Sequence, residues 1–193
     1  MRLRSYPSYD DYKEIQSQFS VRKRRKVWAQ KHILDEVASQ IRSLKIQSPF
    51  GICHGVRNGF EVSYLQKHLS DIDVNVIGTE ISEVSEENSL TIQWDFHDVK
   101  PEWIGKVDFI YLNSFDHSYK PQECMNSWMS CISPNGICIL EWSDLHDAAG
   151  TGEADCFRAS LDEYKSLANQ FHVEDIAMDG KHIPHLVLIS RPK

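Results

Sequence analysis

The chain has 193 residues, of which 41% are apolar and 25% are charged, and its formal net charge is −7. This length suits one well-buried domain and is short for two. No apolar run approaches the ~18 residues of a membrane span, and residues 1–15 lack the apolar core of a signal peptide. The five scattered cysteines form no C-x-x-C pair, which favours a reducing compartment over a disulfide scaffold. We therefore expect a cytoplasmic protein without a membrane segment.

Charge is distributed unevenly along the chain. Residues 1–48 carry 11 Lys and Arg against 5 Asp and Glu, a net charge of +6, whereas residues 49–193 carry 10 against 23, a net charge of −13. The acidic part disfavours a nucleic-acid partner. The basic run Val21–Lys26 has two interpretations: a surface for nucleic acid or an acidic partner, or the solvated start of a helix, which we favour.

The first elements in chain order are an arm and a helix. Residues 1–20 are aromatic and polar and predict an irregular arm with a short helix near 10–18. Apolar residues then recur at helical spacing over residues 21–46. We expect residues 1–47 to form this arm and amphipathic helix, followed by a single α/β domain over residues 48–193. The helix either covers the sheet or pairs with a second subunit in a homo-oligomer.

Strand and helix patterns alternate through the rest of the chain. Strands are predicted near residues 49–54, 74–80, 90–94, 107–112, 137–140, 173–178 and 185–190. Helices are predicted near residues 58–69, 82–88, 121–132 and 157–171, with a turn at Pro134-Asn135-Gly136. This alternation predicts an α/β fold, with a doubly wound, mostly parallel seven-stranded sheet and helices on both faces.

A loop of small residues follows the first predicted strand. The segment PFGICHGVRNG, residues 49–59, leads from an apolar strand through Gly55 and Gly59 into an amphipathic helix. This layout places a bend without Cβ crowding, and a helix N-terminus, beside the end of a strand. It is typical of α/β domains that bind a nucleotide-like cofactor.

Polar side chains collect where the apolar strands stop, which is where ligands bind in such sheets. Glu80 ends the second strand and is placed to accept both hydroxyls of a ribose, with a helix cap or a surface acid as the alternative. Asp95 could accept an adenine amino group and Phe96 could cover the ring, unless they belong to an ordinary loop. His54 is more often structural than reactive in such a position.

In their order, these segments resemble the class I S-adenosylmethionine-dependent methyltransferases. The matching segments are GICHGVRNG, VIGTEIS, QWDFHD, VDFIYLNSF and ISPNGICILEW, which together span about residues 48–190. The segment FDHSY looks like a branch that includes sugar- and natural-product-modifying O-methyltransferases. The resemblance implies a Rossmann-like fold and S-adenosylmethionine as cofactor. It implies cofactor-binding residues at Cys53, His54, Gly55, Gly59, Glu80, Ile81, Asp95, Phe96 and Asn113.

Two positions depart from the family's loop pattern, which begins with an acid and has three alternate glycines. Cys53 stands at the acidic position and Arg57 at the middle glycine. In the family the acid helps to orient the cofactor, so an inactive relative is one interpretation of this chain.

The resemblance also implies an acceptor and a base. We expect O-methylation of a small-molecule or glycan acceptor, with His117 as the first candidate base and His146 as the second. A packing or helix-start role is the alternative for His117. Residues 143–154 are interpreted as either a lid or a plain surface loop.

We expect a hydrogen-bonded pocket without a metal ion. The alternative is an oxygen-rich Mg²⁺ site built from Asp116, Glu141 and Asp144.

Three other functions remain open at this point. The fold could serve as a non-catalytic module that binds a partner, which the altered loop motivates. The basic helix start could direct the enzyme to RNA. A nicotinamide-dependent oxidoreductase would also use a glycine loop and an acid such as Glu80.

Overall fold

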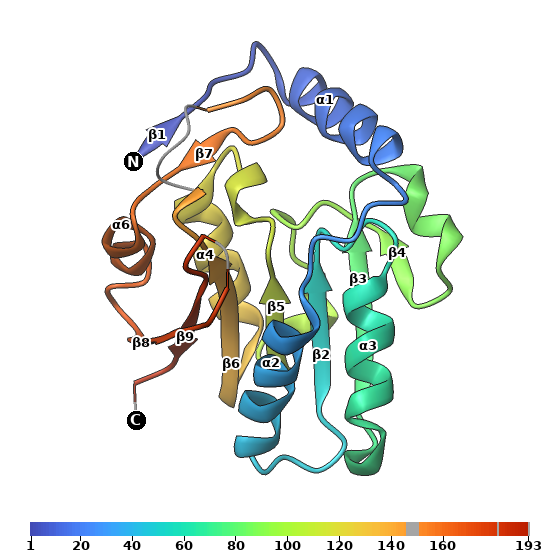
Figure 1. The fold of residues 1–193 in the computed structure, drawn as a ribbon, viewed down its shortest axis with the longest axis vertical. Coiled ribbons are helices and arrows are strands. Elements are labelled where there is room, and N and C mark those ends of the chain that lie inside the picture. The colour runs from blue at the N-terminus through green and yellow to red at the C-terminus, as the bar shows by residue number, and fades with distance from the viewer. Residues whose placement is uncertain (146–150, 181, 193) are drawn as a thin grey trace.

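A seven-stranded sheet forms the centre of the computed structural model, which describes residues 1–145, 151–180 and 182–192 (Figure 1). The strand order is β4-β3-β2-β5-β6-β9-β8, and among these described strands β9 alone runs in the direction opposite to the other six. The bounds are β2 (Phe50–His54), β3 (Asn75–Glu80), β4 (Thr91–Gln93), β5 (Val107–Leu112), β6 (Ile132–Trp142), β8 (His172–Ala177) and β9 (His185–Ser190). The expected doubly wound, mostly parallel sheet is confirmed.

Helices cover both faces of the sheet, because side chains alternate along each strand. Cys53 and Tyr111 point into one buried cluster with α2 (Lys31–Ser43) and α3 (Phe60–His68). Ile52 and Ile110 point into the other, with α4 (Pro121–Cys131) and α6 (Leu161–Ser166). Short 3₁₀ turns complete the connections: η1 (Ser70–Ile72), η2 (Glu83–Glu87), η3 (Pro101–Trp103) and η4 (Phe115–His117). Among the described residues, no helix combines the length and apolarity needed to cross a bilayer.

The chain reverses its direction of travel through the sheet at β2. It passes outward from β2 to β3 and β4, and then returns to the other side of β2 as β5 and β6. The carboxyl ends of β2 and β5 therefore meet at a topological switch point, where α/β sheets bind ligands.

The N-terminal segment lies across this edge of the sheet (Figure 1). Its helix α1 (Tyr9–Arg22) is fixed there because Tyr12 Oη donates to the His117 carbonyl at 3.1 Å and Gln16 Nε2 donates to the Ala154 carbonyl at 2.8 Å. The preceding strand β1 (Arg2–Leu3) pairs with β7 (Phe157–Arg158).

The expectation of one helix over residues 21–46 is wrong. Helix α1 ends at Arg22, residues 23–30 leave the helical conformation, and α2 begins at Lys31. Like charges at helical spacing oppose continuation through the basic run, and the freed carbonyls of Arg24 and Lys26 accept hydrogen bonds from Asn58 instead. Val27 is 47% exposed, so it does not belong to the buried stripe of α2.

Two further boundaries differ from expectation. The helix predicted over residues 157–171 is shortened to α6, because Ser160 and Glu163 form a capping box that starts the helix at Leu161. The predicted turn at residues 134–136 is an irregularity within β6, opposite Val107 and Phe109 of β5. Gly136 is needed there, since a Cβ atom would lie 2.7 Å from the Asp108 carbonyl oxygen.

Candidate active site

The loop after β2 keeps a tight turn despite its altered sequence. Gly55 has φ of +65°, and a Cβ atom there would lie 2.2 Å from Ser114 Oγ at the end of β5, so the close approach of these two segments requires glycine. Arg57 also has a positive φ, of +48°. Its backbone N–H donates to Glu80 Oε2 at 3.0 Å, and this bond to a carboxylate helps to hold an unfavourable conformation.

Glu80 is the buried acid of this site, with 4% of its surface exposed. Its Oε1 accepts hydrogen bonds from the N–H and the hydroxyl of Ser82, at 3.0 and 2.8 Å. Its Oε2 accepts the N–H of Arg57. Because each carboxylate oxygen can accept about two bonds, the remaining acceptor capacity lies on Oε2.

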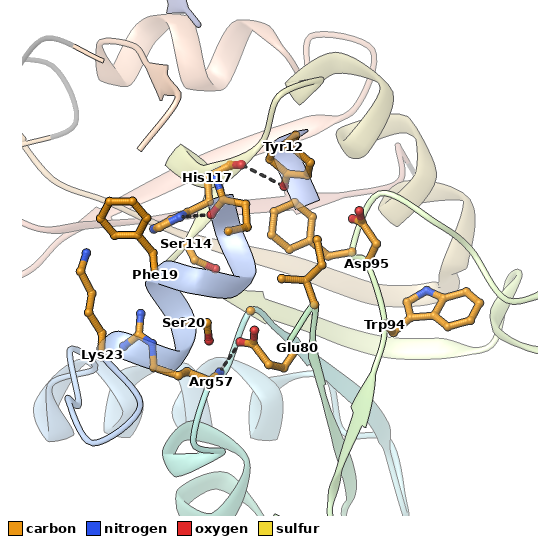
Figure 2. A pocket seen from close by; sticks show the side chains of 14 residues that line it. Tyr12, Phe19, Ser20, Lys23, Arg57, Glu80, Trp94, Asp95, Ser114 and His117 are labelled. Atoms are coloured by element: carbon orange, nitrogen blue, oxygen red, sulfur yellow. Dashed lines mark hydrogen bonds between the residues drawn. The ribbon is translucent and has the colours of Figure 1, made fainter. Parts of the chain in front are cut away.

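A cavity lies between α1 and the carboxyl ends of the strands (Figure 2). It contains about 540 Å³ of space when the part open to solvent is counted, and about 50 Å³ within the cavity itself, which is below the range of small-molecule sites. Six residues predicted from the sequence line it: Gly55, Glu80, Ile81, Asp95, Phe96 and His117. Four separate stretches of sequence, at or just after the ends of β2, β3, β4 and β5, therefore contribute to one cavity.

The other predicted residues lie elsewhere. Cys53 is buried in the cluster beneath α2 and α3, and Gly59 is the N-cap of α3. Asn113 donates to Glu61 Oε1 at 3.5 Å. His146 lies outside the described residues.

His54 has the environment of a structural residue. Its Nδ1 is hydrogen-bonded to Thr79 Oγ1 at 2.8 Å, and its ring stacks on Trp128 with centroids 5.6 Å apart. Burial lowers the pKa of His54 to about 3, so the ring is neutral at physiological pH.

Both carboxylate oxygens of Asp95 have partners within the chain. Oδ1 accepts from the backbone N–H and Nδ1 of His97, at 2.9 and 2.7 Å, and Oδ2 accepts the Tyr9 hydroxyl at 2.8 Å. Burial raises the pKa of Asp95, but the bonds from His97 outweigh it and hold the pKa below its ordinary value. A ligand amino group at Asp95 would have to share or replace the bond from Tyr9.

His117 is oriented by a residue of α1. Gln16 donates through Nε2 to the Ala154 carbonyl, so its Oε1 faces His117 Nδ1 at 2.9 Å. An amide oxygen only accepts, so Nδ1 carries the proton and Nε2 is left with its lone pair. Nε2 lies 3.9 Å from Asp116 Oδ1 and 3.6 Å from Asp155 Oδ1.

Within the described residues, the group with metal-ligand spacing consists of Asp116, His117 and Asp155, whose ligand atoms lie within 4.8 Å of one another. Arg158 already binds both carboxylates, at 3.5 and 3.0 Å. Glu141, which belongs to the alternative Mg²⁺ set, instead accepts the Tyr111 hydroxyl at 3.0 Å. The geometry therefore favours an ion-paired cluster of protein side chains.

Two contributions to this region were not predicted from the sequence. Helix α1 contributes Tyr12, Gln16 and Ser20 to the lining of the cavity. These side chains carry polar groups, so their helical spacing did not indicate a buried face. Glu61 is buried at the start of α3, where burial raises its pKa to about 7. The available signal for Glu61 was a lone acid inside the apolar segment that follows Gly59.

No protein-family model matches the chain, and no curated protein sequence matches it significantly. Solved structures match it by shape. A 1,6-didemethyltoxoflavin-N1-methyltransferase from Burkholderia thailandensis, with bound 1,6-didemethyltoxoflavin and S-adenosylhomocysteine, gives a TM-score of 0.71 at 10% identity, over 98% of this chain and 93% of its own. The plantazolicin methyltransferase BpumL, in complex with a pentazolic desmethylPZN analog and S-adenosylhomocysteine, gives 0.70 at 14% identity, over 95% and 96%.

The chain has the fold of S-adenosylmethionine-dependent methyltransferases. A third match comes from the complex between the Haloferax volcanii Trm112 methyltransferase activator and its methyltransferase partner. It gives a TM-score of 0.64 at 13% identity, over 98% of this chain and 100% of its own. The resemblance read from the sequence is thus confirmed for the methyltransferase fold, while the branch suggested by FDHSY stays a prediction.

Proposed function

We propose that the protein is an S-adenosylmethionine-dependent methyltransferase that methylates an oxygen of a small-molecule or glycan acceptor. The observation that carries this proposal is Glu80, a buried carboxylate that faces the cavity beside the positive-φ loop at Gly55. Two methyltransferases of the same fold hold S-adenosylhomocysteine, one together with 1,6-didemethyltoxoflavin and one together with a pentazolic desmethylPZN analog, in the structures that match this chain.

The residues present fit the nucleoside part of this cofactor. Oε2 of Glu80 keeps capacity to accept a ribose hydroxyl, and Ile81 and Phe96 offer apolar surface for a base. A second hydroxyl would compete with the Ser82 hydroxyl for Oε1. When bound, the cofactor supplies a methyl group made electrophilic by a sulfonium.

We infer that His117 is the general base that accepts the proton of the acceptor hydroxyl. Its Nε2 carries the lone pair because Nδ1–H donates a hydrogen bond to Gln16 Oε1. His117 also lines the cavity. The carboxylates of Asp116 and Asp155 would offset the positive charge that the ring gains. Gln16 acts through His117 and is a positioning residue.

A non-catalytic module is the second candidate function, and Arg57 is the observation that favours it. Its side chain lines the cavity at a position where the family has glycine, and no acid stands at Cys53. In that case the cavity would lack affinity for the nucleoside.

Thermal unfolding with two ligands separates these functions. S-adenosylhomocysteine at about a hundred times its dissociation constant should stabilise the folded protein by ~2.7 kcal/mol, and NAD at the same concentration should not. A shift with NAD alone would favour an oxidoreductase, and the absence of any shift at millimolar ligand would favour the module.

A further inference from the structure

Five consecutive cations include one residue, Lys23, that lines the cavity. We call this segment, Arg22–Lys26, the basic rim. It begins at the last residue of α1 and continues into a turn, so its side chains spread out instead of following one helix face. Lys23 lines the cavity, as does the neighbouring Arg57 (Figure 2), and the other four members of the rim are exposed.

The backbone of the basic rim is tied to the loop after β2. Asn58 Nδ2 donates to the carbonyls of Arg24 and Lys26, at 3.1 and 3.3 Å. Arg57 Nη1 donates to the same Lys26 carbonyl at 3.3 Å. These bonds fix the backbone of the basic rim next to the proposed cofactor loop, which a freely solvated helix end would not require.

Little of the rim's charge is neutralised within the chain. Among the described residues, Arg24 is the member of the rim with an ion pair, to Glu87 at 3.7 Å, and both side chains are about half exposed. Such a pair contributes ~0–1 kcal/mol. Arg22 and Lys23 lie over the Phe19 ring, at 5.0 and 5.2 Å from its centroid, a contact that keeps their charge available.

We propose that the methyl acceptor carries a phosphate group and that the basic rim binds it at the mouth of the cavity. This inference rests on the proposed function, because it names the chemistry of the acceptor. A phosphate brings up to two charges and three acceptor oxygens, and Arg and Lys together match it. A single carboxylate needs one guanidinium, so a run of five cations favours phosphate.

Two sources of phosphate agree with this surface. A phosphorylated small molecule fits the acceptor class proposed above. A single-stranded nucleic acid offers the same group, and Trp28, which is 60% exposed and lies 5.8 Å from Lys26 Nζ, would then stack on a base. The test must therefore separate the two.

Calorimetry on the full chain saturated with S-adenosylhomocysteine tests the proposal, with pyrophosphate, glucose 6-phosphate and citrate as probes. Arg25→Glu combined with Lys26→Glu should weaken binding of pyrophosphate roughly tenfold or more. Lys67→Glu, an exposed charge reversal on α3, should leave it unchanged. Urea unfolding of each variant checks that the fold is retained.

A labelled single-stranded RNA, followed by anisotropy, identifies the source. Binding much tighter than that of pyrophosphate, and weakened by Trp28→Ala, assigns a nucleic-acid strand, whereas equal or weaker binding assigns a small phosphorylated acceptor. Citrate binding as tightly as pyrophosphate, or an unchanged affinity in the double variant, overturns the proposal. If S-adenosylhomocysteine does not bind, the proposed function fails. A titration with pyrophosphate alone then shows separately whether the basic rim binds phosphate.

Discussion

Replacing Glu80 by Gln separates its proposed ligand role from its structural one. The substitution keeps the size of the side chain but removes the charge and one acceptor oxygen. In the folded protein three donors converge on this carboxylate, two from Ser82 and one from Arg57, all within 3.0 Å. An amide group cannot accept from all of them in its original orientation, so we expect Glu80→Gln to lower the free energy of unfolding by about 1–3 kcal/mol.

Glu80→Gln should weaken ligand binding by more than its loss of stability explains. A hydrogen bond to a charged group contributes about 1.5–3 kcal/mol, so calorimetry should show S-adenosylhomocysteine binding roughly 10- to 150-fold more weakly. Ser82→Ala is the matched control, because it removes one donor to Oε1 and leaves the charge. It should cost about 0.5–1.5 kcal/mol of stability without weakening the ligand. If Glu80→Gln loses stability but keeps full affinity, Glu80 is only a structural acceptor.

Three other changes have expected outcomes of their own. Tyr9→Phe frees Oδ2 of Asp95 and should strengthen S-adenosylhomocysteine binding severalfold by calorimetry; an unchanged affinity would show that the ligand does not use Asp95. Burial raises the pKa of Glu61 to about 7 from 4.5, so the stability present below pH 4.5 is lost as the pH rises toward 7. Glu61→Gln should then be more stable than the parent protein at pH 8, by about 1–3 kcal/mol in urea unfolding, and equal stability would contradict the assigned burial. The pKa of His54 is lowered to about 3 from 6.5, so stability present above pH 6.5 falls as the pH drops, by ~1.4 kcal/mol per unit. His54→Gln should flatten this slope in unfolding titrations from pH 6.5 to 4.5, and an unaltered slope would assign it to other groups.

The central strands could be predicted from the sequence because their burial is encoded locally. Val107–Leu112 is a continuous apolar run, as a strand covered on both faces requires. The polar residues that end such runs then meet at one edge through the parallel topology alone. For this reason the sequence alone predicts that Gly55, Glu80 and Asp95 lie near one another, and all three line the cavity.

Helix α1 could not be placed in this way. Its buried face consists of Tyr12, Gln16 and Ser20, and it lies against the polar edge of the sheet instead of an apolar core. Hydrophobic periodicity, which predicted α2, carries no signal for such a helix. The contact of Gln16 with His117 joins residues 101 positions apart, so the orientation of the candidate base depends on tertiary structure.

A crystal structure of the protein with S-adenosylhomocysteine would show where the nucleoside binds. We expect it between α1 and the strand ends, with a ribose hydroxyl within hydrogen-bonding distance of Glu80 Oε2. A nucleoside bound elsewhere on the surface, or a cavity that stays closed by α1 at saturating ligand, would contradict this expectation.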